Sequence, residues 1–452
     1  MSSNGATAAG RFAVVGGGMS GVAAAHRLAA LGHNVELLER DDAVGGRCRP
    51  ARLGDREIAL GGKNIGRRYR LFREFTAAMG NNPYEYFGIN SARIEDGRLR
   101  TFDGTRRLRS MLGLRHRMTA RDAVRFAQVG LLVRSSEANR YLGSSAFAAL
   151  GGAVDPTLAE WFSPRFCRSI LRSVTVRMNG AEPDEAHLGN FGTNAGMLLD
   201  SYDQLTRGMG PVLERFASTH AVLTGADVAS LLVEDGQVRG VRVRHADGIV
   251  EARGYDGVVV ATPAHAAAAL LRDHDPGLAA ELAAVRYFPA AVAVARYDRP
   301  VFSREVRALV FGPEEPLSNA GVYGVDDRET VRYTFSGRRA RAEIERATPD
   351  ELVGRAEELL GRYVPLDGAQ REEVVFRRWP QAYCAYLPDH SRFLSRVRLG
   401  LTRLPGLELA GDYVCGASIE ACFRSARESA LALHARNAER RPRLPRTAAV
   451  IR

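Results

Sequence analysis

The stretch Phe12-Ala-Val-Val-Gly-Gly-Gly-Met-Ser-Gly21 carries the strongest structural signal in this chain of 452 residues. The run Phe12–Val15 is short and apolar, as expected of a buried parallel strand. Gly16, Gly18 and Gly21 follow with the G-x-G-x-x-G spacing. The first glycine permits a tight turn, the second lets backbone approach a pyrophosphate, and the third lets a helix pack on the strand. Taken alone, the pattern also fits a glycine-rich turn that binds nothing.

The residues after the glycine loop complete a strand–helix–strand unit. Met19–Leu31 is rich in alanine and ends before Gly32, which predicts a helix whose N-terminal amides point at the pyrophosphate. Val35–Leu38 predicts the second strand, and Glu39 ends it, 18 residues after Gly21. A carboxylate at this place accepts hydrogen bonds from a ribose 2′-OH, which favours FAD or NAD over NADP.

The turn Gly45-Gly46-Arg47 decides between these two cofactors by resemblance. With the glycine loop, it resembles the N-terminal signature of the flavoprotein superfamily of amine oxidases, protoporphyrinogen oxidases and phytoene-type desaturases. Residues 208–263 and 407–433 resemble later parts of the same superfamily. The resemblance implies bound FAD and an α/β fold, in which a Rossmann-like FAD-binding domain (parallel sheet plus β-meander) carries an inserted α+β substrate domain. It implies little about the substrate, because the superfamily keeps its cofactor frame and varies its pocket.

The same resemblance divides the chain into segments. The discontinuous FAD-binding domain is expected at residues 11–70, 208–285 and 395–436, the substrate domain at 71–207 and 286–394, and tails at 1–10 and 437–452. Turn residues between the short apolar runs from Val222 to Ala261 predict the β-meander. Apolar spacing predicts helical segments at 71–79, 121–133 and, from a proline start, 156–171.

Several residues are assigned to the cofactor by resemblance. Arg47 is expected near the pyrophosphate and ribityl chain, the backbone of Val228 beside the adenine, and Asp412 on a ribityl or pyrophosphate-side hydroxyl. A helix Ile419–Leu433 directs its N-terminal amides at the flavin, where they stabilise the negative charge of the reduced ring. The full expected FAD-binding set is Gly16, Gly18, Met19, Ser20, Gly21, Glu39, Arg40, Gly45, Gly46, Arg47, Gly61, Gly62, Val228, Thr262, Gly411, Asp412, Ser418 and Ile419.

Four residues are expected beside the flavin ring or the substrate, namely Lys63, Asn64, Trp379 and Tyr383. Lys63 is the only lysine of the chain and follows the Gly-Gly-Arg turn, in a segment that passes close to the ring in the resembled family. The alternative is a surface lysine in a turn. The lysine that many amine oxidases carry later in the chain is missing. Cys384 is considered for covalent FAD attachment, against the alternative of an inert core thiol.

These observations lead to the hypothesis of an FAD-dependent oxidoreductase of the amine oxidase superfamily. It would oxidise a C–N bond or desaturate a C–C bond of a small specialised metabolite by hydride transfer to flavin N5, with oxygen or another electron acceptor. The alternatives are a protoporphyrinogen- or carotenoid-type oxidase or desaturase, and a non-redox isomerase that retains bound flavin. An NAD-dependent dehydrogenase would not explain the Gly-Asp and C-terminal helix signatures.

Composition sets further bounds. The net charge of +11 does not indicate nucleic-acid binding, because basic residues alternate with 52 acids and no recognised nucleic-acid motif is present. A solvated basic surface is the simpler interpretation, and attraction of an acidic substrate or of a membrane surface is a secondary one. Five scattered cysteines predict a reduced cytoplasmic protein, with no metal site. No apolar run reaches the roughly 18 residues of a membrane span. The oligomeric state stays open, with a homodimer as one expectation.

Overall fold

The computed structural model describes residues 9–87, 90–95, 98–103, 117–304, 306–364, 366 and 368–439. The two predicted tails therefore lie outside the described residues, apart from 9–10 and 437–439. Residues 437–439 continue the last helix, in which Asn437 is buried, so the helix extends beyond the predicted start of the tail. Part of the predicted substrate domain, residues 104–116, also lies outside the described residues.

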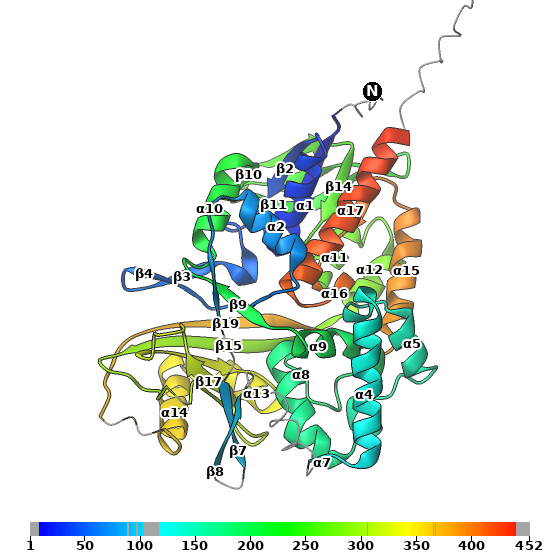
Figure 1. Ribbon diagram of the computed structural model, residues 1–452. Coiled ribbons are helices and arrows are strands. Elements are labelled where there is room, and N and C mark those ends of the chain that lie inside the picture. Colours follow the sequence, from blue (N-terminus) through cyan, green and yellow to red (C-terminus); the bar gives the residue numbers. More distant parts are fainter. Residues whose placement is uncertain are drawn as a thin grey trace, which may run out of the picture.

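Five strands form a parallel sheet in the order β10-β2-β1-β14-β20, in the upper half of Figure 1. The central strand β1 pairs with β2 on one side and β14 on the other, so that Val15 lies opposite both Leu38 and Val260. All carboxyl ends of these strands therefore meet at one edge, as predicted from the glycine loop. The strands are β1 Arg11–Val15, β2 Asn34–Leu38, β10 Ala221–Leu223, β14 Gly257–Val260 and β20 Leu407–Leu409.

Both faces of this sheet are covered, because side chains alternate along each strand. Phe12 and Val14 pack with α1, α2, α10 and α17, whereas Ala13 and Val15 pack with the meander and with α11, α12 and α15. This burial on both faces explains the continuous apolar strand sequences. The helices are α1 Met19–Ala30, α2 Arg70–Ala78, α10 Gly210–Thr219, α11 Ala264–Leu271, α12 Pro276–Ala283, α15 His390–Thr402, α16 Asp412–Cys415 and α17 Ile419–Glu439.

The predicted β-meander is confirmed as an antiparallel sheet of β11 Asp227–Glu234, β12 Gln237–Arg244 and β13 Val250–Gly254. Asp235 and Gly236 connect β11 to β12 with positive φ angles of 48° and 69°. Two such residues in sequence are what a type I′ hairpin turn requires, which explains the Asp-Gly sequence.

A seven-stranded sheet is the main sheet of the lower half of the molecule. Its long strands β15 and β19 cross the middle of Figure 1. Its order is β19-β15-β18-β17-β16-β7-β8, so strands from residues 90–103 join strands from residues 286–385. The two inserted segments thus build one sheet. Its strands are β7 Asn90–Glu95, β8 Arg98–Asp103, β15 Arg286–Tyr297, β16 Ala308–Val310, β17 Leu317–Val322, β18 Thr330–Phe335 and β19 Arg371–Ala385, and α13 Arg338–Arg346 and α14 Pro349–Gly361 pack with it.

Short helices and two small sheets complete the described chain. The helices are α4 Ala120–Ser135, α5 Ser145–Gly151, α6 Leu158–Trp161, α7 Pro164–Phe166, α8 Arg172–Asn179 and α9 Phe191–Leu198. The sheets pair β3 Pro50–Leu53 with β4 Arg56–Ala59, and β5 Ile65–Gly66 with β9 Tyr202–Leu205 and β6 Tyr84–Tyr86. The predicted fold class, an FAD-type parallel sheet and meander with an inserted α+β domain, is confirmed.

The helical segment expected at residues 156–171 is broken into pieces, which corrects the prediction. Thr157 caps α6 in a capping box with Glu160, and Ser163 caps α7 one turn later. Pro164 lacks the N–H that a continuous helix needs and restricts the residue before it, so the chain restarts there. A π-helical turn, Cys167–Leu171, then leads into α8.

Substitution of Gly21 tests the close packing of α1 against β1. A Cβ atom at this position would lie 1.8 Å from the carbonyl oxygen of Gly16, a backbone atom that cannot move aside. We expect Gly21→Ala to lower the free energy of unfolding by about 1–3 kcal/mol or to prevent folding, as measured by chemical denaturation. Gly354→Ala is the matched control in α14, where no atom lies within 4 Å of the new Cβ, and should be neutral or stabilising. Equal stability of the two variants would contradict this packing.

Candidate FAD-binding and active site

The glycine loop lies at the carboxyl end of β1 with space in front of it. Gly16 has a φ of +97°, and its added Cβ would meet Thr262 Cγ2 at 3.1 Å, which brings the predicted Thr262 beside the loop. Among the described residues, no atom lies within 4 Å of a Cβ added to Gly18. The loop is thus tightly packed at Gly16 and Gly21 but open at Gly18, as a site for close approach by a pyrophosphate requires.

The Gly-Gly-Arg turn packs directly against this loop. Gly45 donates its N–H to the carbonyl of Gly17 at 2.7 Å, and a Cβ on Gly46 would lie 3.1 Å from the Cα of Gly18. Gly45 and Gly46 both have positive φ angles, 115° and 50°, that favour glycine. The two signatures therefore form one continuous backbone surface.

Glu39 lies next to the same surface and is nearly buried. Its carboxylate accepts hydrogen bonds from the N–H groups of Gly17, at 2.5 Å, and Asp41, at 2.8 Å. The Glu39 carbonyl accepts from Ala226 at 2.9 Å, so the chain entering β11, which carries Val228, starts beside it. Its neighbour Arg40 is exposed. The predicted ribose and adenine residues thus follow one another along the edge of the sheet.

Asp412 joins the N-terminal signature to the C-terminal one. Its carboxylate is 3% exposed and lies 2.8 Å from Nη1 of Arg47, while Tyr287 donates to it at 3.0 Å. Burial and the charge of Asp412 raise the pKa of Tyr287, so the hydroxyl stays protonated and donates. The Oδ2 atom of Asp412 is buried. Among the described residues it forms the ion pair with Arg47 but no hydrogen bond of good geometry. This oxygen is available to a hydroxyl of a bound group.

The remaining predicted cofactor residues lie around this ion pair. A Cβ on Gly61 would be 1.7 Å from the Arg47 carbonyl, and one on Gly62 would be 3.7 Å from Ile419 Cδ1. Ser418 accepts a hydrogen bond from Ala421 and so caps the start of α17. The Gly-Gly pair and the N-terminus of α17 therefore face each other beside Arg47, and these residues fit the extended FAD that the sequence implied.

Lys63 is half-buried at the boundary with the substrate sheet, so the alternative of a solvated turn lysine does not hold. Its Nζ donates to Gln204 at 2.9 Å and to the carbonyl of Tyr323, and lies 4.0 Å from the ring centroid of Phe87. Burial, reinforced by the positive charge of Arg332, lowers the pKa of Lys63 well below its usual range. The charge of the Lys63 amine is therefore less favourable here than in water.

The other predicted ring-side residues lie close by. Asn64 has a buried Oδ1 without a hydrogen-bond partner in the described part of the chain, and Trp379 Nε1 donates to the carbonyl of Leu60 at 3.3 Å. Tyr383 follows Ala382, whose carbonyl accepts from Arg47 at 2.8 Å. All of these side chains come from segments that border Arg47.

Cys384 lies on β19, next to Tyr383, and its side chain is fully buried. Burial raises the pKa of its thiol well above the usual value, which disfavours the reactive thiolate. It has the properties of an inert core thiol rather than those of an attachment point.

Three residues that complete the site carry no local sequence signal. Tyr287 is the second residue of β15, Tyr323 directly follows β17, and Arg332 lies inside β18. Arg332 donates to the carbonyls of Ala59 at 2.7 Å and Gly61 at 2.9 Å. Each acts through contacts with residues more than 100 positions away, which no local pattern encodes.

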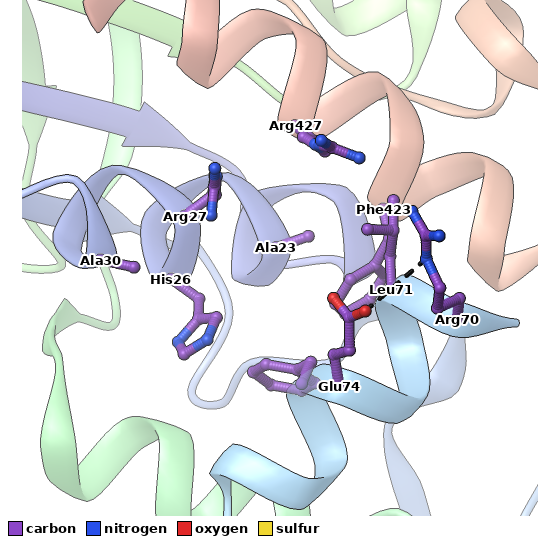
Figure 2. Close-up of a pocket in the computed structure, with 10 residues that line it drawn as sticks. Ala23, His26, Arg27, Ala30, Arg70, Leu71, Glu74, Phe423 and Arg427 are labelled. Carbon is purple, nitrogen blue, oxygen red and sulfur yellow. Dashed lines mark ion pairs between the residues drawn. The ribbon is translucent and has the colours of Figure 1, made fainter.

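A surface pocket of about 330 Å³ lies elsewhere, between α1, α2 and α17 (Figure 2). His26 and Arg27 of α1 line it, together with Arg427 of α17 and the Arg70–Glu74 ion pair. None of the predicted FAD-binding residues lines this pocket, so it is separate from the candidate site.

Comparison with known proteins decides the family. Residues 19–434 match the flavin containing amine oxidoreductases. The chain belongs to this family. FAD is accordingly its cofactor, and the expectation of an FAD-dependent oxidoreductase is confirmed at the level of the family.

Individual relatives are distant or matched in part. The L-amino-acid oxidase of Sistrurus catenatus edwardsii is 40% identical over 80 residues, which cover 18% of this chain and only 16% of that protein. The putative protoporphyrinogen oxidase of Exiguobacterium sp. 255-15 has the same fold, with a TM-score of 0.71, 18% identity, and coverage of 95% of this chain and 99% of that one. Cyclohexylamine oxidase from Brevibacterium oxydans IH-35A has a TM-score of 0.71 and 17% identity, with 95% of this chain and 99% of that chain covered.

A fatty acid isomerase shares the fold as well. The CLA-producing enzyme from P. acnes has a TM-score of 0.66 and 15% identity, with 93% of this chain and 97% of that chain covered. At such identities these similarities establish the fold alone, so they do not select a reaction.

Asp412→Ala tests the ion pair. The variant leaves Arg47 without its carboxylate and Tyr287 without its acceptor, so we expect a loss of about 1–3 kcal/mol in stability and a clear drop in the FAD retained after purification. The ratio of flavin to protein absorbance measures the second effect. Asp42→Ala is the matched control, because Asp42 forms an exposed ion pair with Arg49 and should matter little. Full FAD retention in Asp412→Ala would contradict the assignment.

Lys63 offers a direct pKa measurement, because it is the only lysine. Labelling with 13C-lysine gives one side-chain signal, whose titration we expect to have its midpoint clearly below the ordinary value of about 10.4. In denaturant the midpoint should return to that value. Between the two midpoints the unfolded chain binds more protons, so the Lys63 contribution makes stability rise with pH across that window. An unshifted midpoint in the folded protein would show a solvated ammonium.

Proposed function

We propose that the protein oxidises a C–N bond, or desaturates a C–C bond, of a small specialised metabolite, with oxygen or another acceptor taking up the electrons. The observation that supports this most is the junction of Arg47, Asp412 and Tyr287, which gathers three distant segments beside an open glycine loop. The junction borders Lys63 and Tyr383, so the side chains that fit a cofactor adjoin those that suit a substrate.

The roles of the residues follow from their surroundings. FAD, when bound, would supply two-electron redox chemistry. Arg47 and Asp412 would hold its ribityl and pyrophosphate side, and the N-terminal end of α17 would favour negative charge at its ring. Lys63, whose pKa burial lowers, takes up a proton at Nζ or positions a water as the substrate is oxidised.

Protoporphyrinogen- or carotenoid-type oxidation and flavin-retaining isomerisation are the competing outcomes. A cytoplasmic location and a homodimer, both expected from the sequence, stay predictions. Across the part of the chain that the structure describes, no helix is both long and apolar enough to cross a bilayer.

The decisive experiment is a visible spectrum of the purified protein, followed by anaerobic mixing with amines, polyenes and tetrapyrroles. We expect a yellow protein whose flavin absorbance is lost with an amine and returns on admission of oxygen or another acceptor. Reduction by dithionite serves as the control that the bound flavin can be reduced. Bleaching by polyenes alone or tetrapyrroles alone would select the carotenoid-type or the protoporphyrinogen-type reaction. A flavin that dithionite reduces but no candidate substrate does would favour an isomerase instead.

A further inference from the structure

Arg177 on α8 is a half-buried cation without a counter-ion. In the described part of the chain its guanidinium has no hydrogen bond and no carboxylate partner. Arg172, on the same helix, pairs with Glu182 at 2.7 Å with both side chains buried. Removing a charged guanidinium from water costs free energy. Glu182 offsets this cost at Arg172, whereas no described carboxylate offsets it at Arg177.

Arg177 lies at the substrate side of the candidate site. The helix α8 ends at Gly180, where an added Cβ would lie 2.7 Å from Cδ2 of Tyr383. On the other side of Tyr383, the carbonyl of Ala382 accepts a hydrogen bond from Arg47. Tyr383 therefore lies between α8 and the Gly-Gly-Arg turn, and its hydroxyl has no hydrogen bond to any described residue.

Three arginines lie close enough to the Tyr383 hydroxyl for their charges to act on its pKa. Burial raises its pKa, and the charges of Arg332, Arg177 and Arg47 oppose that rise. Asp412 neutralises Arg47, whereas among the described residues Arg332 donates hydrogen bonds to the carbonyls of Ala59 and Gly61 and has no carboxylate partner. In the described part of the chain, the charges of Arg177 and Arg332 thus act on the Tyr383 hydroxyl without carboxylate partners of their own.

Three acids whose charges act on Lys63 or Tyr202 already have partners. Asp327 pairs with Arg56, and Glu85 accepts a hydrogen bond from Gln204, the partner of Lys63. Asp200 accepts the N–H of Ser201 at 2.8 Å. The positive charge at Arg177 and Arg332 therefore remains for a bound molecule.

We infer that the substrate carries a carboxylate, which the Arg177 guanidinium and the Tyr383 hydroxyl bind, with Arg332 adding positive charge nearby. The planar fork of arginine matches a carboxylate, and a tyrosine hydroxyl donates a further hydrogen bond. This inference rests on the proposed function and narrows its substrates to acids, such as amino acids or unsaturated carboxylic acids. One secondary interpretation of the basic net charge was attraction of an acidic substrate. The inference names Arg177, Tyr383 and Arg332 as the residues that would attract it.

The test is equilibrium binding to the FAD-loaded protein by calorimetry, with benzoate and indole-3-acetate as probes and their neutral amides as isosteres. We expect each acid to bind at least tenfold more tightly than its amide. Arg177→Gln should weaken binding of the acids on the order of 10- to 100-fold and leave the amides unchanged. Tyr383→Phe should cause a smaller loss, and Arg177→Lys should restore part of the affinity.

Two controls separate binding from folding. Arg168→Gln makes the same charge change at an exposed position one π-turn before α8, and should leave both acids and amides unaffected. Arg177→Gln should unfold at the same or a higher temperature than the wild type, because it removes an uncompensated charge. An arginine with a structural role would instead lower the unfolding temperature.

The outcomes distinguish this inference from the proposed function. Equal affinity for acids and amides, no binding of either acid, or an unchanged preference in Arg177→Gln would overturn the carboxylate site. Flavin bleaching by a neutral amine alone would also overturn it while leaving the redox function in place. A carboxylate preference lost in Arg177→Gln, in a protein whose flavin no substrate bleaches, would support the site and reject the redox reaction.

Discussion

The ion pair between Arg47 and Asp412 is the interaction on which the arrangement of the site depends. These residues are far apart in the chain, and their charged groups lie 2.8 Å apart at the edge of one parallel sheet. Because Asp412 follows β20 and Arg47 follows the loop beyond β2, the contact can form only when both strands join β1 and β14 in register. Tyr287, at the start of β15, donates a hydrogen bond to the Asp412 carboxylate. The seven-stranded sheet is therefore attached to the same carboxylate.

Close backbone approaches impose the second constraint. Gly21 touches the carbonyl of Gly16, and Gly61 touches the carbonyl of Arg47 at distances that leave no room for a side chain. The backbones of the helix, the strand and the two signature turns consequently pack together with almost no side chains between them. Gly18 differs from these positions, because the space beside it leaves room for a bound group.

Sequence reasoning succeeded where contacts are local and failed where they are not. The strand, glycine loop, helix and second strand from Arg11 to Leu38 follow periodicity and turn chemistry, as does the hairpin at Asp235 and Gly236. The break at Pro164 was misjudged, because apolar spacing continued through a point where a proline and a serine cap restart the helix. Tyr287 and Arg332 could not be found at all, since strand pairing alone brings them to the site.

The unusual choice of arginine over lysine bears on how this interior works. A guanidinium stays charged at any physiological pH and can donate to several carbonyls at once, as Arg332 does with Ala59 and Gly61. The basic groups around the site are therefore fixed charges and fixed donors, which do not titrate. Lys63 is the exception, because burial and the neighbouring arginines lower the pKa of its amine. Permanent positive charge at Arg177 and Arg332 suits the binding of an anion, whereas Lys63 is the one basic side chain at this boundary whose charge can change with pH. In the proposed function, anion binding and proton transfer therefore belong to chemically different side chains.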